Sequence, residues 1–139
     1  DLKNVLAIKH RIDSSNQKRT DIVEEIDDYY FHIFKEKSNS ASKINTESPG
    51  WVVDRLSILN LKIFHMNEQT ERKEVSQEHI LNCREKLNIL RKQKIDLSLS
   101  FDQLLKDYKS GVKKMKVYRQ MKMYNDSTLN PELYQKNKS

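Results

Sequence analysis

The chain has 139 residues, of which 36% are hydrophobic and 33% charged, with two Gly, two Pro and one Cys. A single cysteine excludes an internal disulfide and a cysteine-based zinc site. No stretch predicts a membrane span or a signal peptide, so we expect a cytoplasmic protein. The length fits one domain, 1–139, and the scarcity of turn residues indicates a few long amphipathic helices.

The net charge of +6 lies at the C-terminal end of the chain. Residues 1–108 hold 18 basic and 18 acidic side chains, whereas residues 109–139 hold eight basic and two acidic ones. A charge gathered in one segment indicates that this segment meets a ligand or partner of opposite charge.

The first predicted helix covers about residues 2–35. Its apolar stripe has spacings of three and four residues, with a polar interruption at Ser15, Asn16 and Arg19. The chain opens at Asp1, without a Met and inside this helix, so we expect a further helix before it. The stripe consists of Val5, Ile8, Ile12, Val23, Ile26, Tyr30 and Ile33.

A polar linker, 37–47, is rich in Ser, Asn and Lys and predicts a surface loop. The second predicted helix follows at about 49–71, with Ser48 as its N-cap and Pro49 in the first helical position. Apolar residues cover most of its circumference, which predicts a central helix that is buried on several sides.

The third predicted helix covers about 76–109. Its near-heptad apolar stripe is interrupted at Lys94, and Gly111 is expected to end it. The basic segment 110–139 follows. Its alternating Met and Lys residues over 112–124 are compatible with a short strand, an extended segment or an irregular helix.

These elements predict an all-α fold. Long helices with short connections pack as an antiparallel bundle, here of three helices, or of four with the additional N-terminal helix. An irregular C-terminal segment completes the predicted architecture.

Three stretches carry a resemblance to a known family. RIDSSNQKRTDIVEEID, INTESPGWVVDRLSILNLKIFHM and VYRQMKMYNDSTLNPELY resemble an uncharacterised bacterial family, a domain of unknown function. Its motifs here are RLSILNLKIFHM and QMKMYND..LNPELY, and the resemblance covers nearly the whole chain. It implies a helical protein with extra residues at the N-terminus and no assigned catalytic residue. Similar proteins are encoded near glycosyltransferases of the heptosyltransferase type, which implies a link to surface glycan biosynthesis.

The polar interruption of the first helix is the first candidate site. Asn16 and Arg19 lie one turn apart on the apolar face, where a guanidinium group needs a partner because an unpaired buried charge is costly. Asp54 and Lys94 are expected at the same height on the other two helices. The group predicts either a ligand site or a polar layer that fixes the register of the helices. As a ligand site it suits an enzyme that acts on a phosphorylated or nucleotide-linked substrate.

The basic C-terminal segment is the second candidate site. Basic and aromatic side chains together bind phosphates and stack on rings, which singles out Arg119, Lys122 and Tyr124. Asn125 and Asp126 follow in a predicted turn. Because the rest of the chain is neutral, we expect an anionic small ligand or a protein partner rather than nucleic acid. The alternative is a solvated segment whose methionines pack on the bundle.

The remaining polar residues predict no catalytic chemistry. The four histidines form no metal-binding pair, and the acidic cluster between Asp21 and Asp28 fits a solvated helix face. Cys83 lies on an apolar stripe and is expected to be a small buried hydrophobe. We therefore expect no metal, no cofactor and no catalytic residue. The sequence favours a non-catalytic helical binding protein, with the enzyme as the alternative and a homo-oligomer left open.

Overall fold

The structure is a computed structural model that describes residues 2–121, 126, 128 and 129. In this part of the chain all regular structure is helical, apart from one isolated β-bridge, which confirms the predicted all-α fold. The three helices lie within two residues of their predicted bounds. They are α1 (Leu2–Phe34), α2 (Pro49–Thr70) and α3 (Gln77–Ser110).

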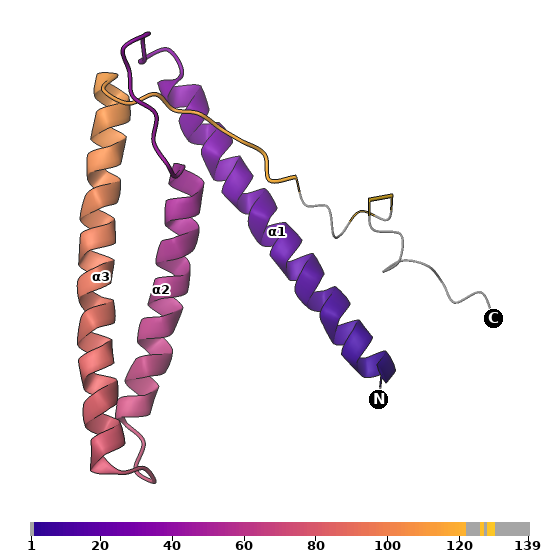
Figure 1. The fold of residues 1–139 in the computed structure, drawn as a ribbon, viewed down its shortest axis with the longest axis vertical. Coiled ribbons are helices and arrows are strands. Elements are labelled where there is room, and N and C mark those ends of the chain that lie inside the picture. The colour runs from indigo at the N-terminus through magenta and orange to yellow at the C-terminus, as the bar shows by residue number, and fades with distance from the viewer. Residues whose placement is uncertain (1, 122–125, 127, 130–139) are drawn as a thin grey trace, which may run out of the picture.

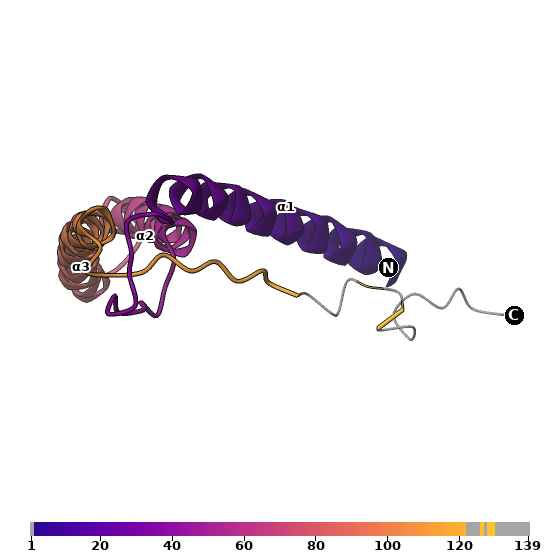
Figure 2. The same ribbon diagram turned by 90° about the horizontal axis from the view of Figure 1, so that it is seen from above.

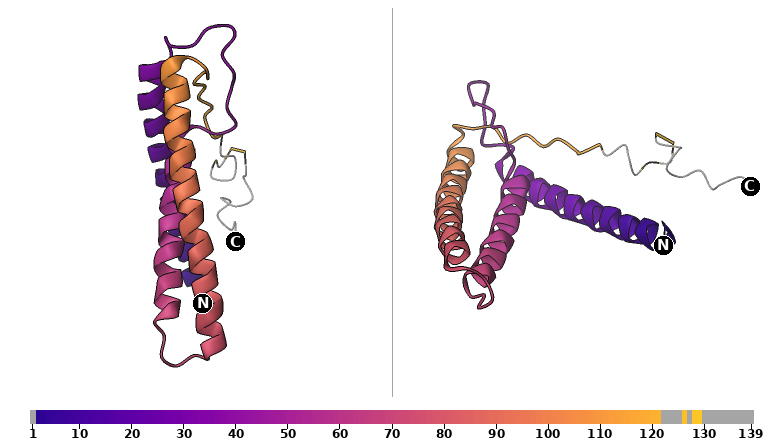
Figure 3. Two further views of the ribbon diagram at one scale, coloured as in Figure 1. Left: turned by 90° about the vertical axis from the view of Figure 1, so that its left-hand side faces the viewer. Right: turned by 60° about the horizontal axis from the view of Figure 1, so that its bottom comes forward.

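α1 meets the pair of helices α2 and α3 at one end of the molecule and diverges from them toward the other end (Figure 1). α2 and α3 form an antiparallel hairpin, and the C-terminal half of α1 packs on the start of α2 (Figure 1). We call the shared end the junction. The N-terminal half of α1 points away from the hairpin, as the views from above and from below also show (Figure 2, Figure 3). The antiparallel packing of all three helices is therefore confined to the junction.

This divergence corrects two predictions about burial. Val5, Ile8 and Ile12 of α1 were expected in the core, yet they are 65%, 54% and 54% exposed. α2 was expected to be buried on several sides, yet Leu61 and Phe64 are 57% and 58% exposed. The reason is the same in both cases, because away from the junction α1 no longer covers α2. Among the described residues, no helix is long and apolar enough to cross a membrane.

The core of the junction is rich in aromatic side chains. Leu104 and Tyr108 at the end of α3 are buried together with Met115 beyond it. Tyr30 and Phe34, at the end of α1, pack against this cluster, and the ring centroids of Phe34 and Tyr108 are 5.8 Å apart. Aromatic pairs at this separation add to the stabilisation that comes from burial alone. The cluster therefore fixes α1 to the end of α3.

α1 and α2 approach each other most closely at Gly50. A Cβ atom at this position would lie 2.3 Å from the carbonyl oxygen of Val23 and 2.9 Å from the Oδ1 atom of Asp27. Asp27 is buried, and it accepts hydrogen bonds from the Ser48 hydroxyl at 2.6 Å and from the Gly50 amide at 2.7 Å. Ser48 is the N-cap residue, as predicted, but it makes no capping bond of its own. The carboxylate of α1 instead satisfies the N-terminus of α2.

Gly111 ends α3 in the left-handed conformation, with a φ angle of 77°, as predicted. A Cβ atom there would lie 2.3 Å from the carbonyl oxygen of Lys37. The chain then runs extended beside the linker, because the Lys114 amide donates to the Lys43 carbonyl at 2.7 Å and the Lys43 amide donates to that of Val112 at 3.0 Å. Of the three conformations that the sequence left open, the described part of this segment takes the extended one.

The substitution Gly50→Ala is expected to lower the free energy of unfolding by about 1–3 kcal/mol, because the added methyl group forces α1 and α2 apart. In an exposed helix the same change stabilises by up to about 1 kcal/mol, so the sign of the effect is diagnostic. Urea unfolding followed by circular dichroism measures it.

Asn88→Ala is the matched control, since Asn88 lies on an exposed position of α3. It should leave the free energy of unfolding unchanged or slightly raised. If Gly50→Ala behaved in the same way, the two helices would not meet at Gly50.

Candidate ligand site at the helix junction

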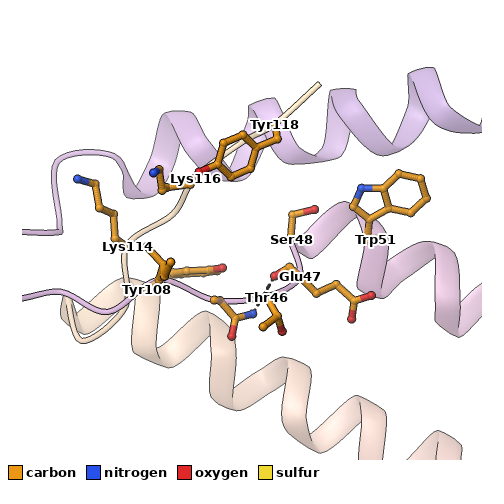
Figure 4. Close-up of a pocket in the computed structure, with 10 residues that line it drawn as sticks. Thr46, Glu47, Ser48, Trp51, Tyr108, Lys114, Lys116 and Tyr118 are labelled. Carbon is orange, nitrogen blue, oxygen red and sulfur yellow. Dashed lines mark hydrogen bonds between the residues drawn. The ribbon is translucent and has the colours of Figure 1, made fainter. Parts of the chain in front are cut away.

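A cavity of about 310 Å³ opens at the junction, between the linker, the start of α2, the end of α3 and the extended segment (Figure 4). We call it the junction pocket. Its lining combines basic, aromatic and hydroxyl side chains from parts of the chain that are distant in sequence. The residues are Ile44, Asn45, Thr46, Glu47, Ser48, Trp51, Tyr108, Lys114, Lys116 and Tyr118.

Tyr108 supplies a buried phenol to the junction pocket. Its side chain is only 2% exposed, and the hydroxyl end points toward the linker residues (Figure 4). Burial is the main cause that raises the pKa of Tyr108 to about 12, and the negative charge of Asp27 raises it further, while a hydrogen bond with Asn45 acts in the opposite direction. The phenol is therefore neutral at physiological pH and keeps a proton that it can donate.

Two lysines place positive charge at the mouth of the pocket. Lys114 and Lys116 are exposed on the extended segment, and the Nζ atom of Lys116 lies 5.4 Å from the ring centroid of Tyr118. Within the described residues neither ammonium group forms an ion pair. The one carboxylate in the lining, that of Glu47, is 2.5 Å from the guanidinium of Arg55. The net charge that an entering ligand meets is positive.

Two aromatic rings extend the surface of the pocket. Trp51, on the first turn of α2, and Tyr118, on the extended segment, are among its lining residues (Figure 4). Flat side chains of this kind stack on aromatic rings and on the apolar faces of sugars. Together with the lysines and the Tyr108 hydroxyl they form a surface suited to an anion that carries a ring.

The first candidate site of the sequence consists of Asn16, Arg19, Asp54 and Lys94. The structure assembles this group only in part. Arg19 and Asp54 form a two-pronged ion pair, with the Nη2 atom of Arg19 2.6 Å from Oδ2 of Asp54. The side chain of Asp54 is 8% exposed and that of Arg19 48%. The hydrogen bond to Asp54 is the main cause that raises the pKa of Arg19. Asp54 is therefore committed to holding α1 against α2.

The other two members of that group, Asn16 and Lys94, are both exposed. Asn16 is exposed on α1, where its carbonyl accepts a bond from the Thr20 hydroxyl at 3.0 Å. Lys94 is exposed in the middle of α3 and lines neither the junction pocket nor the cavity beside Arg19 and Asp54. The structure thus brings Arg19 to Asp54 but does not bring Lys94 to either.

The C-terminal candidates divide in a similar way. Arg119 contacts the acidic cluster of α1, with its guanidinium 2.7 Å from Asp28 and 3.2 Å from Glu24. These contacts, the bond to Asp28 first, raise the pKa of Arg119. Asp126 accepts bonds from the amide and hydroxyl of Thr128, which lower its pKa and fit the predicted turn. Lys122, Tyr124 and Asn125 lie outside the described residues.

Cys83, a further residue that the sequence singled out, has a close neighbour from its own helix. Cys83 is buried at 6% exposure, as expected, and its Sγ atom lies 3.4 Å from Nε2 of His79. In the part of the chain that the structure describes, no three His, Cys, Asp or Glu side chains gather closely enough to hold a metal ion.

The comparison with family models adds one finding. The model described as a protein of unknown function, DUF4254, matches residues 1–117. The chain belongs to the DUF4254 family. This match contains nine of the ten residues that line the junction pocket, because only Tyr118 lies beyond it. No curated protein and no solved structure matches this DUF4254 chain.

Sequence reasoning missed the junction pocket because its residues had other interpretations. Tyr108 belongs to the apolar stripe of the third predicted helix, Trp51 begins the apolar run of the second, and Asn45 lies in the polar linker. The signal present in the sequence was the density of basic and aromatic residues just after Gly111. It pointed to the extended segment that contributes to the junction pocket but not to the linker that faces it.

The stability of the protein is expected to fall between pH 10 and pH 12 partly through Tyr108. Its pKa is about 12 in the folded state against about 10 in an unfolded chain, so folding favours the protonated phenol. The resulting stabilisation, roughly 2–3 kcal/mol, is complete below pH 10 and is lost as the pH rises through 12. Urea unfolding across this range measures it.

Tyr108→Phe removes the titrating group and should flatten this part of the pH profile. Tyr118→Phe is the control, because Tyr118 is 74% exposed and should leave the profile unchanged. A Tyr108→Phe profile as steep as that of the wild type would contradict the prediction.

A double-mutant cycle tests the role of Arg19 and Asp54. Arg19→Met is expected to lower the free energy of unfolding by roughly 1–3 kcal/mol, since it leaves the buried carboxylate of Asp54 without its partner. Adding Asp54→Leu should cost less than in the wild type, and urea unfolding of the four proteins measures the coupling. Lys18→Met, a neighbouring exposed position, is the control. Strictly additive effects would mean that the ion pair does not hold the helices.

Proposed function

We propose that this chain is a non-catalytic binding protein whose junction pocket holds a small anionic ligand that contains a ring. The observation that carries the proposal is one cavity that is lined by two lysines, by the aromatic rings of Trp51 and Tyr118, and by the buried neutral phenol of Tyr108. Lysine is suited to phosphate groups as a point charge, and the rings of Trp51 and Tyr118 provide a stacking surface. A concave site in which charged and hydroxyl groups converge beside aromatic rings is a reasonable place for a ligand with both polar and flat parts.

The size of the pocket favours a small molecule over a protein partner. Its volume of about 310 Å³ lies at the lower end of the range for small-ligand sites. A sugar phosphate or a nucleotide-linked sugar has both the charge and the ring that the lining suits. This ligand class also agrees with the link to surface glycan assembly that the family resemblance implies, in which the protein would serve as an accessory in a bacterial cytoplasm.

The enzyme alternative has less support. It requires Asp54 to act as a base or a metal ligand near Arg19, but the Asp54 carboxylate is occupied by the Arg19 guanidinium. The Ser48 hydroxyl in the junction pocket donates to Asp27, but this carboxylate is buried and also accepts the Gly50 amide at the N-terminus of α2, which favours its charged form over action as a base. Both observations favour binding over turnover.

The single tryptophan provides the assay. Trp51 is the only Trp in the chain and lines the junction pocket, so a ligand that enters should change its fluorescence. We expect saturable changes with a sugar phosphate, a nucleoside diphosphate or a nucleotide-sugar, and smaller ones with inorganic phosphate. A ligand at about a hundred times its dissociation constant should also stabilise the fold by about 2.7 kcal/mol.

Lys116→Gln is expected to weaken binding by about tenfold, because it removes one phosphate-facing charge. Lys92→Gln removes an exposed lysine of α3 that is not part of the junction pocket lining, and it should bind as the wild type does. If no compound of the three classes altered Trp51 fluorescence, or if both variants bound equally well, the junction pocket would not be the site.

A further inference from the structure

The extended segment, residues 112–121, has two different sides. Met115 and Val117 belong to the aromatic cluster at the end of α3, and Met115 is only 3% exposed. Side chains of an extended chain point alternately to opposite sides, so the residues between these two face the other way. That other side is the wall of the junction pocket. The residues on it are Lys114, Lys116 and Tyr118.

Arg119 continues the inward side of the segment and contacts α1. Its guanidinium lies 2.7 Å from Asp28 and 3.2 Å from Glu24. The backbone amide of Gln120 donates to the Oε1 atom of Glu24 at 3.0 Å, and its side-chain oxygen accepts the Thr20 hydroxyl at 3.4 Å. Thr20, Glu24 and Asp28 lie on successive turns of one face of α1. The end of the segment therefore runs beside this face (Figure 2).

The pocket wall is thus fixed on both sides of its ligand-facing residues. At its start, the Lys114 amide donates to the Lys43 carbonyl of the linker, and Met115 is buried. Immediately after Tyr118, Arg119 holds the segment to α1. Arg119 itself is not a lining residue of the junction pocket, and its guanidinium is engaged by carboxylates on the opposite side of the segment.

We propose that Arg119 is a positioning residue of the junction pocket, which by binding Asp28 and Glu24 holds Lys116 and Tyr118 where a ligand meets them. The inference rests on the proposed function, because it assigns a further residue to the same ligand site. It also gives part of the acidic cluster of α1, which the sequence predicted to be a solvated face, a role in building that site.

The exposure of the ion pair determines what its loss should change. The side chains of Arg119 and Asp28 are each 51% exposed, and exposed ion pairs contribute little to the stability of a fold. A wall that leaves its place in a fraction of the molecules instead lowers the apparent affinity by the fraction in which the pocket is complete. Loss of Arg119 is therefore expected to weaken ligand binding while the helices keep their stability.

Hydrogen exchange of the ligand-free protein, followed by NMR, tests whether Arg119 fixes the wall. Arg119→Gln should lower the protection of the Gln120 amide, which is bonded to α1, and leave that of the Lys114 amide, which is bonded to the linker. Arg72→Gln is the matched control, because it removes an exposed ion pair in the connection 71–76 and should alter neither amide. Unchanged protection of the Gln120 amide in Arg119→Gln would overturn the proposal.

Titration with a nucleoside diphosphate, followed by Trp51 fluorescence, tests the effect on the site. Arg119→Gln should weaken binding by about two- to fivefold, the size expected when an exposed ion pair no longer holds the wall. Its free energy of unfolding should equal that of the wild type, and Arg119→Lys should recover part of the affinity. Equal affinity of Arg119→Gln and a ligand-binding wild type would contradict the proposal and leave the proposed function intact.

Exchanging the two charges separates positioning from direct contact with the ligand. Arg119→Glu should weaken binding, and adding Asp28→Arg should restore it, because the ion pair forms again with its signs reversed. If Arg119 instead touched the phosphate, the double variant would bind as poorly as Arg119→Glu, which would overturn the proposal. If the wild type bound no compound of the three classes, the proposed function would fail, and the protection of the Gln120 amide would still decide whether Arg119 fixes the segment.

Discussion

Asp27 of α1 accepts hydrogen bonds from the Ser48 hydroxyl and from the Gly50 amide, so that a carboxylate of one helix lies at the N-terminus of the next. A buried carboxylate is tolerated there because unpaired amides and the helix dipole compensate its charge. The contact fixes where α2 starts relative to α1 and which path the linker takes between them. The linker in turn forms one wall of the junction pocket, and the charge of Asp27 contributes to the raised pKa of Tyr108. Helix packing and site chemistry therefore share one residue.

The positions of the helices could be predicted because they depend on local rules. Apolar spacing, Pro49 after a capping serine and Gly111 in the left-handed conformation all act within a few residues. The extent of burial could not be predicted in the same way. The stripe with Ile8 and Ile12 shows that α1 has an apolar face, but periodicity does not say which partner covers it. The angle between α1 and α2 follows from contacts at Gly50 that involve backbone atoms, and these have no sequence signature beyond the glycine itself.

Those parts of the candidate site that depend on residues close together in the sequence could be predicted, and the other parts could not. The charge excess after α3 pointed to the extended segment, and Lys114 and Lys116 belong to it. The polar break at Arg19 pointed to a buried partner, which the structure identifies as Asp54. The pocket itself arises because the linker pairs with the extended segment through Lys43, a backbone bridge that any two polar segments can form. Such a bridge depends on backbone groups rather than on side chains, so it could not be predicted from the sequence.

The bonds that close the junction also have a consequence for the order of folding. α2 and α3 are joined by the short connection 71–76, so their contacts are local in sequence. The bonds from Ser42 to Gly111 and from Arg119 to Asp28 instead span 69 and 91 residues. Loop-closure entropy opposes such distant contacts until partners are already in place. We therefore expect the hairpin to form early and the pocket to be completed last, so that its walls exist only in the fully assembled chain. A molecule bound there would report on the whole tertiary structure rather than on one helix.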